Sequence, residues 1–466
     1  MTRRTWKVAY RHACAYRRAM PSWSKHRRID VFVFVGLVAT TFAFQPHAPS
    51  RAAFSRTTLR DSSSPAASLT NTEQSRRTSD LPPPPCPRSN PADDLFRSIR
   101  GTWPVWFQNF LRESGLLRSV EDALILLAVP ELLRTYGPHA IETFVQLSKR
   151  TTQIPYGDHS MQYMDLIEPT DGSSANGGVV AFVHGGAWGS GKPWMYRLAA
   201  LPFLEANQTV AMLGYRTYPD ADVNGQVEDI GSALDVIART RPDLLDDQGR
   251  IDSLVCHSSG AHIGLLHVLE AARASFAMER NATSISTTGS VVTPTSTPIG
   301  RFVGISGVYC IPSHYEYERG RGVDQLSSLR AANGPGHDGF REASPVYRLE
   351  CFDGANGEEE CVLLSAEGDE DSREAMVLDN HVPDMLFVHG VDDNVVQYNQ
   401  TNIIVDAIRS SLGEPGRCQE VLIENIGHAD TVLHLMFGGV TRDFLLACPE
   451  PKNFSQTPPG SHNRRP

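Results

Sequence analysis

Short apolar runs alternate with stretches of helical periodicity from Ile154 onward, and this alternation limits the folds open to the chain. Segments with helical periodicity lie at Pro193–Glu205, Gln226–Thr240 and Ala261–Glu270. Strands that alternate with helices form a mostly parallel central sheet with helices on both faces, which predicts an α/β fold. The apolar runs predicted to be its strands are Met164–Glu168, Val179–Val183, Thr209–Leu213, Leu254–Val255, Phe302–Ile305, Met385–Val388 and Gln419–Ile423.

Composition divides the remainder of the 466 residues into appendages, because one such domain needs roughly 250–300 residues. The predicted segments are a targeting presequence (1–60), a disordered linker rich in Ser and Pro (61–95), a helical N-terminal segment (96–150), the α/β domain (151–449) and a disordered tail (450–466). The helical segment is expected either to pack on the domain or to contact a membrane surface.

The presequence prediction depends on the apolar run Val31–Phe44, which follows the basic residues Lys25, Arg27 and Arg28. The run is shorter than the roughly 20 residues of a membrane-spanning helix and fits the hydrophobic region of a signal peptide. The Arg-, Ser- and Thr-rich stretch after it is typical of transit peptides. The junction at Phe44 resembles the bipartite plastid-targeting presequences of algae with secondary plastids. A signal anchor in the endoplasmic reticulum membrane is the alternative, and it would associate the chain with a membrane through its N-terminal region.

The formal charge of −10 is unevenly distributed. Basic residues are concentrated in residues 1–60, where Asp30 is the single acidic residue, so the rest of the chain is strongly acidic. Binding of nucleic acid needs clustered Lys and Arg to neutralise phosphates, and no such cluster follows Arg77. Nucleic acid is therefore not an expected partner.

The eight cysteines form no CxxC pair, which argues against a zinc site or a redox dithiol. Most are expected to be buried thiols. Bridges between Cys351 and Cys361, or between Cys418 and Cys448, are the alternative if the chain meets an oxidising compartment.

A candidate nucleophile follows the predicted strand Leu254–Val255. The segment Cys256–Gly260 (CHSSG) is a G-x-S-x-G turn with Cys256 in the first glycine position. A sharp turn from strand to helix would expose Ser258 above the sheet, which requires small residues two positions before and after it. An ordinary Ser-rich turn is the alternative, but the strand before it and the helix after it favour the nucleophile.

A glycine-rich turn, His184–Gly189 (HGGAWG), follows the predicted strand Val179–Val183. Acyl transfer develops negative charge on a carbonyl oxygen, and glycines allow backbone N–H groups to approach that oxygen closely. The expected donors are the N–H groups of Gly186, Ala187 and Ser259. A phosphate cradle is the alternative, but the turn has neither the Lys-Ser/Thr of a P-loop nor a G-x-G-x-x-G pattern.

The remaining candidates occur in the order Ser, Asp, His that such a nucleophile turn requires. Asp393 in HGVDDNVV is the expected acid, with Asp392 as the alternative, and His428 on a glycine turn after a late strand is the expected base. His428 would take the proton from Ser258 while the carboxylate holds its tautomer. Other histidines are interpreted as surface or structural residues: His257, His262, His389 and His434.

These motifs together resemble one branch of the α/β-hydrolases, the branch that contains isoprenylcysteine methylesterases. Kynurenine formamidases and BD-FAE-like carbohydrate-acetyl or feruloyl esterases are its relatives. The resemblance covers about residues 150–447 and is carried by His184–Gly191 (HGGAWGSG), Gly214–Leu234 (GYRTYPDADVNGQVEDIGSAL), Cys256–His262 (CHSSGAH), His389–Val396 (HGVDDNVV) and Asn425–Leu433 (NIGHADTVL).

The resemblance implies a serine esterase with no metal and no cofactor, in which Ser258, Asp393 and His428 form the catalytic triad. Gly185–Ala187 would then form the oxyanion hole with Ser259. The expected substrate is a methyl or short-acyl ester of a hydrophobic molecule, because the helices before the domain resemble those of the methylesterases and the apolar Trp188 and Trp194 lie near the predicted oxyanion turn. A formamidase-like amidase and a non-catalytic receptor or scaffold are the alternatives.

The chain departs from the family pattern in four places. Cys256 replaces a glycine, and Ser259 stands where alanine is frequent, although neither change removes a catalytic atom. Two insertions, Arg280–Pro298 and Asp353–Asp384, are expected to be disordered surface loops. The second, which is rich in acids, is alternatively a lid.

Overall fold

The structure is a computed structural model that describes residues 105–115, 137, 139–170, 178–284, 296–325, 327–334, 336–349, 381–411 and 417–447. The predicted presequence, linker and tail lie outside these ranges, as does most of the acidic insertion, so these interpretations stay predictions. Within the ranges, no helix is both long and apolar enough to cross a membrane.

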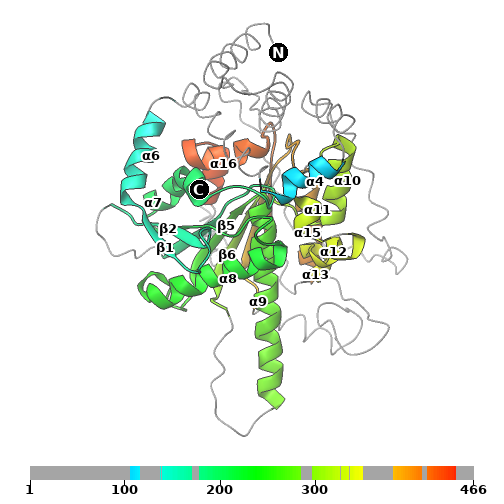
Figure 1. Ribbon diagram of the computed structural model, residues 1–466. Helices are drawn as coiled ribbons and strands as arrows, with labels where there is room; N and C mark the ends of the chain where they lie inside the picture. Colours follow the sequence, from blue (N-terminus) through cyan, green and yellow to red (C-terminus); the bar gives the residue numbers. More distant parts are fainter. Residues whose placement is uncertain are drawn as a thin grey trace, which may run out of the picture.

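The core of the fold is an eight-stranded sheet with the order β1-β2-β4-β3-β5-β6-β7-β8. Figure 1 shows strands of this sheet in the middle of the domain, with helices around them. The first two pairs in this order are antiparallel and the other five are parallel. The predicted α/β class with a mostly parallel sheet is therefore confirmed. The strands are β1 (Thr152–Pro155), β2 (Tyr163–Ile167), β3 (Val179–Val183), β4 (Thr209–Leu213), β5 (Ile251–His257), β6 (Ile299–Ile305), β7 (Asp384–Gly390) and β8 (Cys418–Ile423).

Both faces of the sheet are buried, because alternate side chains of each central strand enter two separate cores. Val179, Ala181 and Val183 of β3 join one core, while Val180 and Phe182 join the other. The strands are apolar on both faces for this reason, and each fully buried Val or Phe contributes about 1.5–3 kcal/mol of hydrophobic stabilisation.

Different helices cover the two faces. The first core contains residues of α8 (Val223–Thr240), η3 (Pro242–Leu244), α9 (Ser259–Ser284), α10 (Ile311–Arg321), α11 (Leu329–Ala332), α12 (His337–Glu342), α13 (Pro345–Leu349) and α15 (Asn399–Ser411). The second contains residues of α6 (His139–Arg150), η2 (Pro193–Ala200), α7 (Leu201–Glu205), α16 (His428–Phe437) and α17 (Val440–Ala447). The remaining described helix is α4 (Val105–Glu113).

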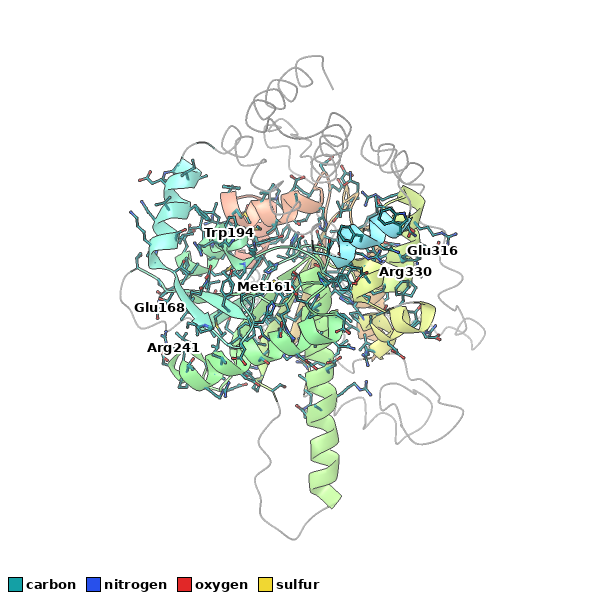
Figure 2. The ribbon with its side chains drawn as sticks, viewed as in Figure 1. Met161, Glu168, Trp194, Arg241, Glu316 and Arg330 are labelled. Carbon is teal, nitrogen blue, oxygen red and sulfur yellow. The ribbon has the colours of Figure 1, made fainter. Side chains whose placement is uncertain are left out.

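The N-terminal helices α4 and α6 pack on this domain. Phe144 of α6 meets the ring of Trp194 edge to face, with 6.5 Å between the ring centroids. Trp194 is labelled in Figure 2 and lies near α6. Arg112 of α4 donates to the carbonyl oxygen of Gln325 at 3.2 Å, and Glu113 accepts from the hydroxyl of Tyr218. Of the two expectations for this segment, packing on the domain holds for the part that the structure describes.

Three differences from the predicted elements have physical causes. β1 has no counterpart among the predicted strands, because it is a short, mostly exposed edge strand without an apolar run. β5 begins earlier than predicted because the polar residues Asp252 and Ser253 lie within it. The loop prediction for Arg280–Pro298 is wrong at its start, since α9 continues to Ser284 and extends beyond the sheet (Figure 1).

Two of the cysteines predicted to be buried thiols, Cys256 and Cys418, are free and buried. Burial raises the pKa of the Cys418 thiol to about 12, and it also raises the pKa of Cys256 well above its usual value. Cys418 therefore forms no bridge, contrary to the alternative that paired it with Cys448. The other pairing, Cys351 with Cys361, lies outside the described residues.

Cys256 occupies the first glycine position of the G-x-S-x-G turn because α9 leaves room for its sulfur. A Cβ added at Gly264 would lie 2.5 Å from Sγ of Cys256 but 3.6 Å from its Cβ. The glycine that the motif lacks on the strand is thus compensated by a glycine on the helix.

Gly264→Ala is expected to destabilise the protein by about 1–3 kcal/mol through this overlap, although alanine in a helix normally stabilises by about 1 kcal/mol. Cys256→Ala removes the sulfur and leaves an ordinary contact, so the double variant should recover most of the loss. Urea unfolding of the wild type, both single variants and the double variant measures this coupling. Additive effects of the two changes would contradict the account.

Candidate active site

Ser258 lies at the sharp turn between β5 and α9. Its backbone is in the left-handed region, with φ of 55°, which is uncommon for a residue with a side chain. The turn is held because the Ser258 N–H donates to the Ile305 carbonyl of β6 at 2.9 Å. The Ser258 carbonyl in turn accepts from the N–H of Ala261 at 2.9 Å. The geometry is that of a nucleophile elbow.

The turn lies where ligands bind in open α/β sheets. β4 lies on one side of β3 and β5 on the other, so the strand order reverses at β3. The carboxyl ends of the two strands on either side of such a switch point form a crevice. β3 ends at Val183, which pairs with Cys256 of β5, so the turn after β3 and the elbow after β5 face the same crevice.

Glycines permit the close approach of these two turns. A Cβ at Gly260 would overlap the carbonyl oxygen of His184, and a Cβ at Gly185 would lie 2.8 Å from the Cβ of Ser258. A side chain at either position would push the turns apart. Gly185 is therefore the residue of the β3 turn that lies against Ser258.

The carbonyl groups of the β3 turn are held in fixed directions. The Gly186 carbonyl accepts from the N–H groups of Gly189 at 3.0 Å and Ser190 at 2.9 Å, and from the Ser190 hydroxyl at 3.0 Å. The Gly185 carbonyl is 2.9 Å from Nδ1 of His184. In a trans peptide the N–H points opposite to the carbonyl, so the N–H groups of Gly186 and Ala187 point away from these partners.

Within the described residues, the N–H groups of Gly186, Ala187 and Ser259 make no hydrogen bond to another backbone group. Ser259 is the first residue of α9, where N–H groups have no partner within the helix and carry part of its positive dipole. The N–H of Gly185 differs, because it forms a hydrogen bond with Tyr196. This hydrogen bond lowers the pKa of Tyr196, but burial has the larger effect and raises that pKa to about 12. Three of the four predicted oxyanion residues thus offer N–H groups.

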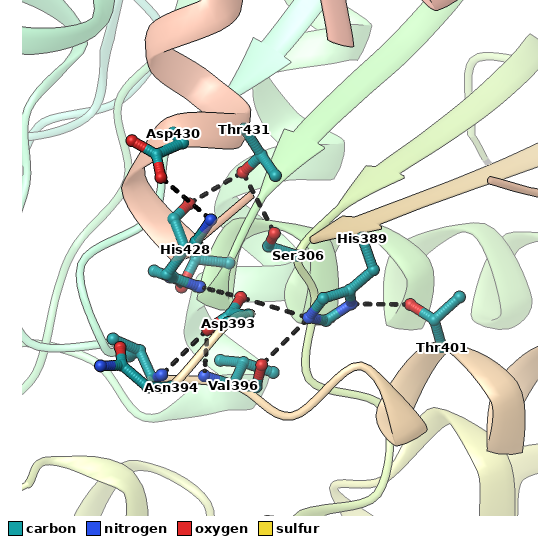
Figure 3. Close-up of polar contacts among 12 residues, drawn as sticks. Ser306, His389, Asp393, Asn394, Val396, Thr401, His428, Asp430 and Thr431 are labelled. Carbon is teal, nitrogen blue, oxygen red and sulfur yellow. Dashed lines mark hydrogen bonds and ion pairs between the residues drawn. The ribbon is translucent and has the colours of Figure 1, made fainter. Parts of the chain in front are cut away.

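Ser258, His428 and Asp393 form one hydrogen-bonded chain. Nε2 of His428 is 3.0 Å from Oγ of Ser258. Nδ1 of His428 is 2.7 Å from Oδ2 of Asp393 (Figure 3). The Ser258 hydroxyl can donate to Nε2 while Nδ1–H donates to the carboxylate. The structure brings these three predicted residues together from three loops that are distant in sequence.

Two backbone N–H groups hold the other carboxylate oxygen of Asp393. Oδ1 accepts from Val395 at 2.9 Å and from Val396 at 2.8 Å. Burial of the side chain favours the neutral carboxyl, but His428, His389 and their hydrogen bonds outweigh burial and keep the pKa of Asp393 below its usual range. The alternative acid, Asp392, is exposed.

Side chains at the start of α16 hold the backbone around His428. The Thr431 hydroxyl donates to the His428 carbonyl at 2.8 Å and lies 3.1 Å from the Ser306 hydroxyl of the loop after β6 (Figure 3). Oδ2 of Asp430 accepts from the N–H of Gly427, the residue before α16, at 3.0 Å. The ring of His428 therefore projects from a fixed helix start.

The other histidines differ from one another in their surroundings. His257 and His262 are buried, and burial lowers their pKa values to about 3 and about 4, so both are neutral at pH 7. His434 is half-buried. His389 is fully buried and lies 3.2 Å from Asp393, a contact that the sequence interpretation missed. Its position four residues before Asp393 in the same motif was the available signal.

Trp188, one of the two tryptophans that motivated the expectation of a hydrophobic substrate, is buried. It is 1% exposed, and its indole Nε1 donates to Nδ1 of His262 at 3.0 Å. Trp194 is half-buried and packs against α6. Trp188 instead fixes the end of the glycine-rich turn to α9.

In the described part of the chain, no group of three or more His, Cys, Asp or Glu residues is arranged to hold a metal ion. The chemistry that the arrangement offers is nucleophilic attack: a hydroxyl, an imidazole that can take its proton, a carboxylate that orients the imidazole, and backbone donors nearby.

The strand order, the elbow at Ser258 and the order of Ser258, Asp393 and His428 along the chain define an α/β-hydrolase fold. Residues 164–346 match the BD-FAE family model. This range contains Ser258 and the glycine-rich turn and ends before Asp393 and His428.

The curated relatives are esterases. Isoprenylcysteine alpha-carbonyl methylesterase of Arabidopsis thaliana is 26% identical over 280 residues, which cover 60% of this chain and 56% of that protein. Esterase LipC of Mycobacterium tuberculosis is 24% identical over 261 residues, 55% of each protein. The matched region thus spans little more than half of each relative. Among solved structures, an inhibited esterase B from Lactobacillus rhamnosis is 15% identical, with a TM-score of 0.46, over 69% of this chain and 94% of that chain.

Helix α10 packs against the loop that carries Asp393. The Tyr317 hydroxyl donates to the Asn394 carbonyl at 2.9 Å, and Arg321 donates to the Val395 carbonyl at 3.4 Å. Glu318, one turn before the helix end, is buried and accepts from the Ser327 hydroxyl at 3.0 Å. Burial raises the pKa of Glu318 to about 7, although Ser327 and Arg321 oppose the rise.

Because the pKa of Glu318 is higher in the folded state than in the unfolded state, this carboxyl favours folding only in its protonated form. The free energy of unfolding should therefore lose a contribution as pH rises between about 4.5 and 7. Glu318→Gln should match the wild type at pH 4 and exceed it by about 1–3 kcal/mol at pH 8, measured by urea unfolding at both values. An equal difference at the two pH values would contradict this explanation.

Proposed function

We propose that the chain hydrolyses small carboxylic esters through an acyl-enzyme on Ser258. The observation that carries the proposal is the position of His428, 3.0 Å from the Ser258 hydroxyl on one side and 2.7 Å from the Asp393 carboxylate on the other. In the proposed reaction Nε2 of His428 takes the hydroxyl proton as Oγ attacks the ester carbonyl. His428 then gives this proton to the departing alcohol. In the second half of the reaction His428 takes a proton from water as the water attacks the acyl-enzyme, and this proton passes to Oγ of Ser258 as the acid leaves.

The oxyanion would be stabilised by the N–H groups of Gly186, Ala187 and Ser259. Their directions are fixed before substrate arrives, because His184, Ser190 and the start of α9 hold the surrounding backbone. Preorganised donors of this kind are each worth roughly 10²–10³-fold in rate. Asp393 would hold the tautomer of His428 and stabilise the imidazolium that forms.

The substrate class follows from the relatives. Their names describe esterases, and the first of them a methylesterase of an isoprenylcysteine, so a methyl or short-acyl ester is the proposed substrate. Turnover of a prenylcysteine methyl ester should exceed turnover of N-formylkynurenine, which is the substrate expected of a formamidase-like amidase. Failure on both, with an active serine, would remove this substrate proposal while leaving the esterase chemistry.

The first test is labelling of the full-length protein with a fluorophosphonate probe, followed by gel fluorescence. The wild type should be labelled and Ser258→Ala should not, because the probe reacts only with an activated serine. Ser253→Ala, which changes a serine on β5 away from the elbow, is the matched control and should label like the wild type. An unlabelled but folded wild type would favour the receptor or scaffold alternative.

A second test separates the two neighbouring acids. Asp393→Asn should lower kcat/KM for p-nitrophenyl acetate by about 10³–10⁴-fold, because the amide favours the wrong tautomer of His428. Asp392→Asn changes an exposed carboxyl and should stay within about threefold of the wild type. The opposite order of the two effects would show that the hydrogen bond between Asp393 and His428 is not the one used.

A further inference from the structure

His389 contacts the same carboxylate oxygen that His428 contacts. It lies near the end of β7 and is fully buried. Its Nε2 is 3.2 Å from Oδ2 of Asp393 and 3.0 Å from the carbonyl oxygen of Val396, and its Nδ1 is 2.8 Å from the hydroxyl of Thr401 (Figure 3). Both ring nitrogens thus have polar partners.

The partners determine where the ring proton lies. The two oxygens next to Nε2, a carboxylate and a carbonyl, can only accept, so Nε2 must carry a proton. The Thr401 hydroxyl on α15 can donate to Nδ1, so that both ring nitrogens have a hydrogen-bond partner. The Nε2–H group is then shared between Asp393 and the backbone of the loop that follows it.

Four donors therefore surround the Asp393 carboxylate. Oδ1 accepts the N–H groups of Val395 and Val396, and Oδ2 faces Nδ1 of His428 and Nε2 of His389. A carboxylate fixed at both oxygens cannot rotate about its side-chain bonds without losing donors in a buried site. The direction of Oδ2 toward His428 follows from this arrangement.

We infer that His389 is a positioning residue. Its Nε2–H is shared between Oδ2 of Asp393 and the Val396 carbonyl, and it thereby holds the carboxylate in the direction of His428. The inference rests on the proposed function, in which Asp393 orients the base. His389 does not touch the reacting atoms and acts through Asp393.

Two variants of His389 test this positioning role. His389→Leu removes the N–H, whereas His389→Gln keeps an amide N–H near the position of Nε2. Thr401→Val is a milder variant that keeps the ring and removes the hydroxyl that fixes its tautomer. His267→Leu is the matched control, because His267 is also a buried histidine but lies on α9 outside the site.

Two readouts are made on each full-length variant. The first is the kcat and KM for p-nitrophenyl acetate. His389→Leu should lower kcat about 10–100-fold with KM within about threefold, Thr401→Val should lower it less, and His389→Gln should recover most of the loss. The second is the downfield proton resonance of Nδ1–H in His428, recorded without substrate. It should weaken or move in His389→Leu and persist in His389→Gln and His267→Leu.

Unchanged kcat and an unchanged resonance in His389→Leu would overturn the inference. A kcat in His389→Gln as low as in folded His389→Leu would also overturn it, because the N–H would then not be what matters. A wild type with no esterase turnover would instead contradict the proposed function. The resonance in the variants would then decide the positioning role alone.

Discussion

The contact between the glycine-rich turn after β3 and the elbow after β5 is the constraint on which the site depends. Gly260 leaves space for the His184 carbonyl, and Gly185 lies against the Cβ of Ser258. Because β3 and β5 are adjacent and parallel, their carboxyl ends place a strained serine and a row of outward N–H groups in one crevice. The rest of the fold supports this contact, including Gly264, which accommodates the sulfur of Cys256 behind the elbow.

Asp393 and His428 reach this crevice from the loops that follow β7 and β8 of the same sheet. β7 ends at Gly390 shortly before Asp393, and β8 ends at Ile423 shortly before His428. Neither loop is fixed by the sheet alone. Donors from Val395, Val396 and His389 hold the carboxylate, and Thr431 holds the backbone of His428. The short distances between Ser258, His428 and Asp393 thus depend on the buried hydrogen bonds that hold Asp393 and His428 in place.

Much of this could be predicted from sequence, because buried parallel strands and G-x-S-x-G turns have strong local signals. The seven predicted strands all occur, whereas the exposed edge strand β1 has no apolar run to reveal it. Spacing alone left Asp392 open beside Asp393, since the choice depends on a loop conformation fixed by backbone donors. The contact of His389 with Asp393 and the burial of Trp188 against His262 depend on packing between distant segments, which no local pattern encodes.

The central claim is that Ser258 carries the acyl group during turnover. Its most direct test is to mix the full-length wild type with p-nitrophenyl acetate, quench with acid within the first turnover, and measure the intact mass and the peptide that contains residue 258. The account predicts a mass increase of one acetyl group, located on Ser258. Turnover without any acetylated Ser258, or with the acetyl group on another residue, would contradict it.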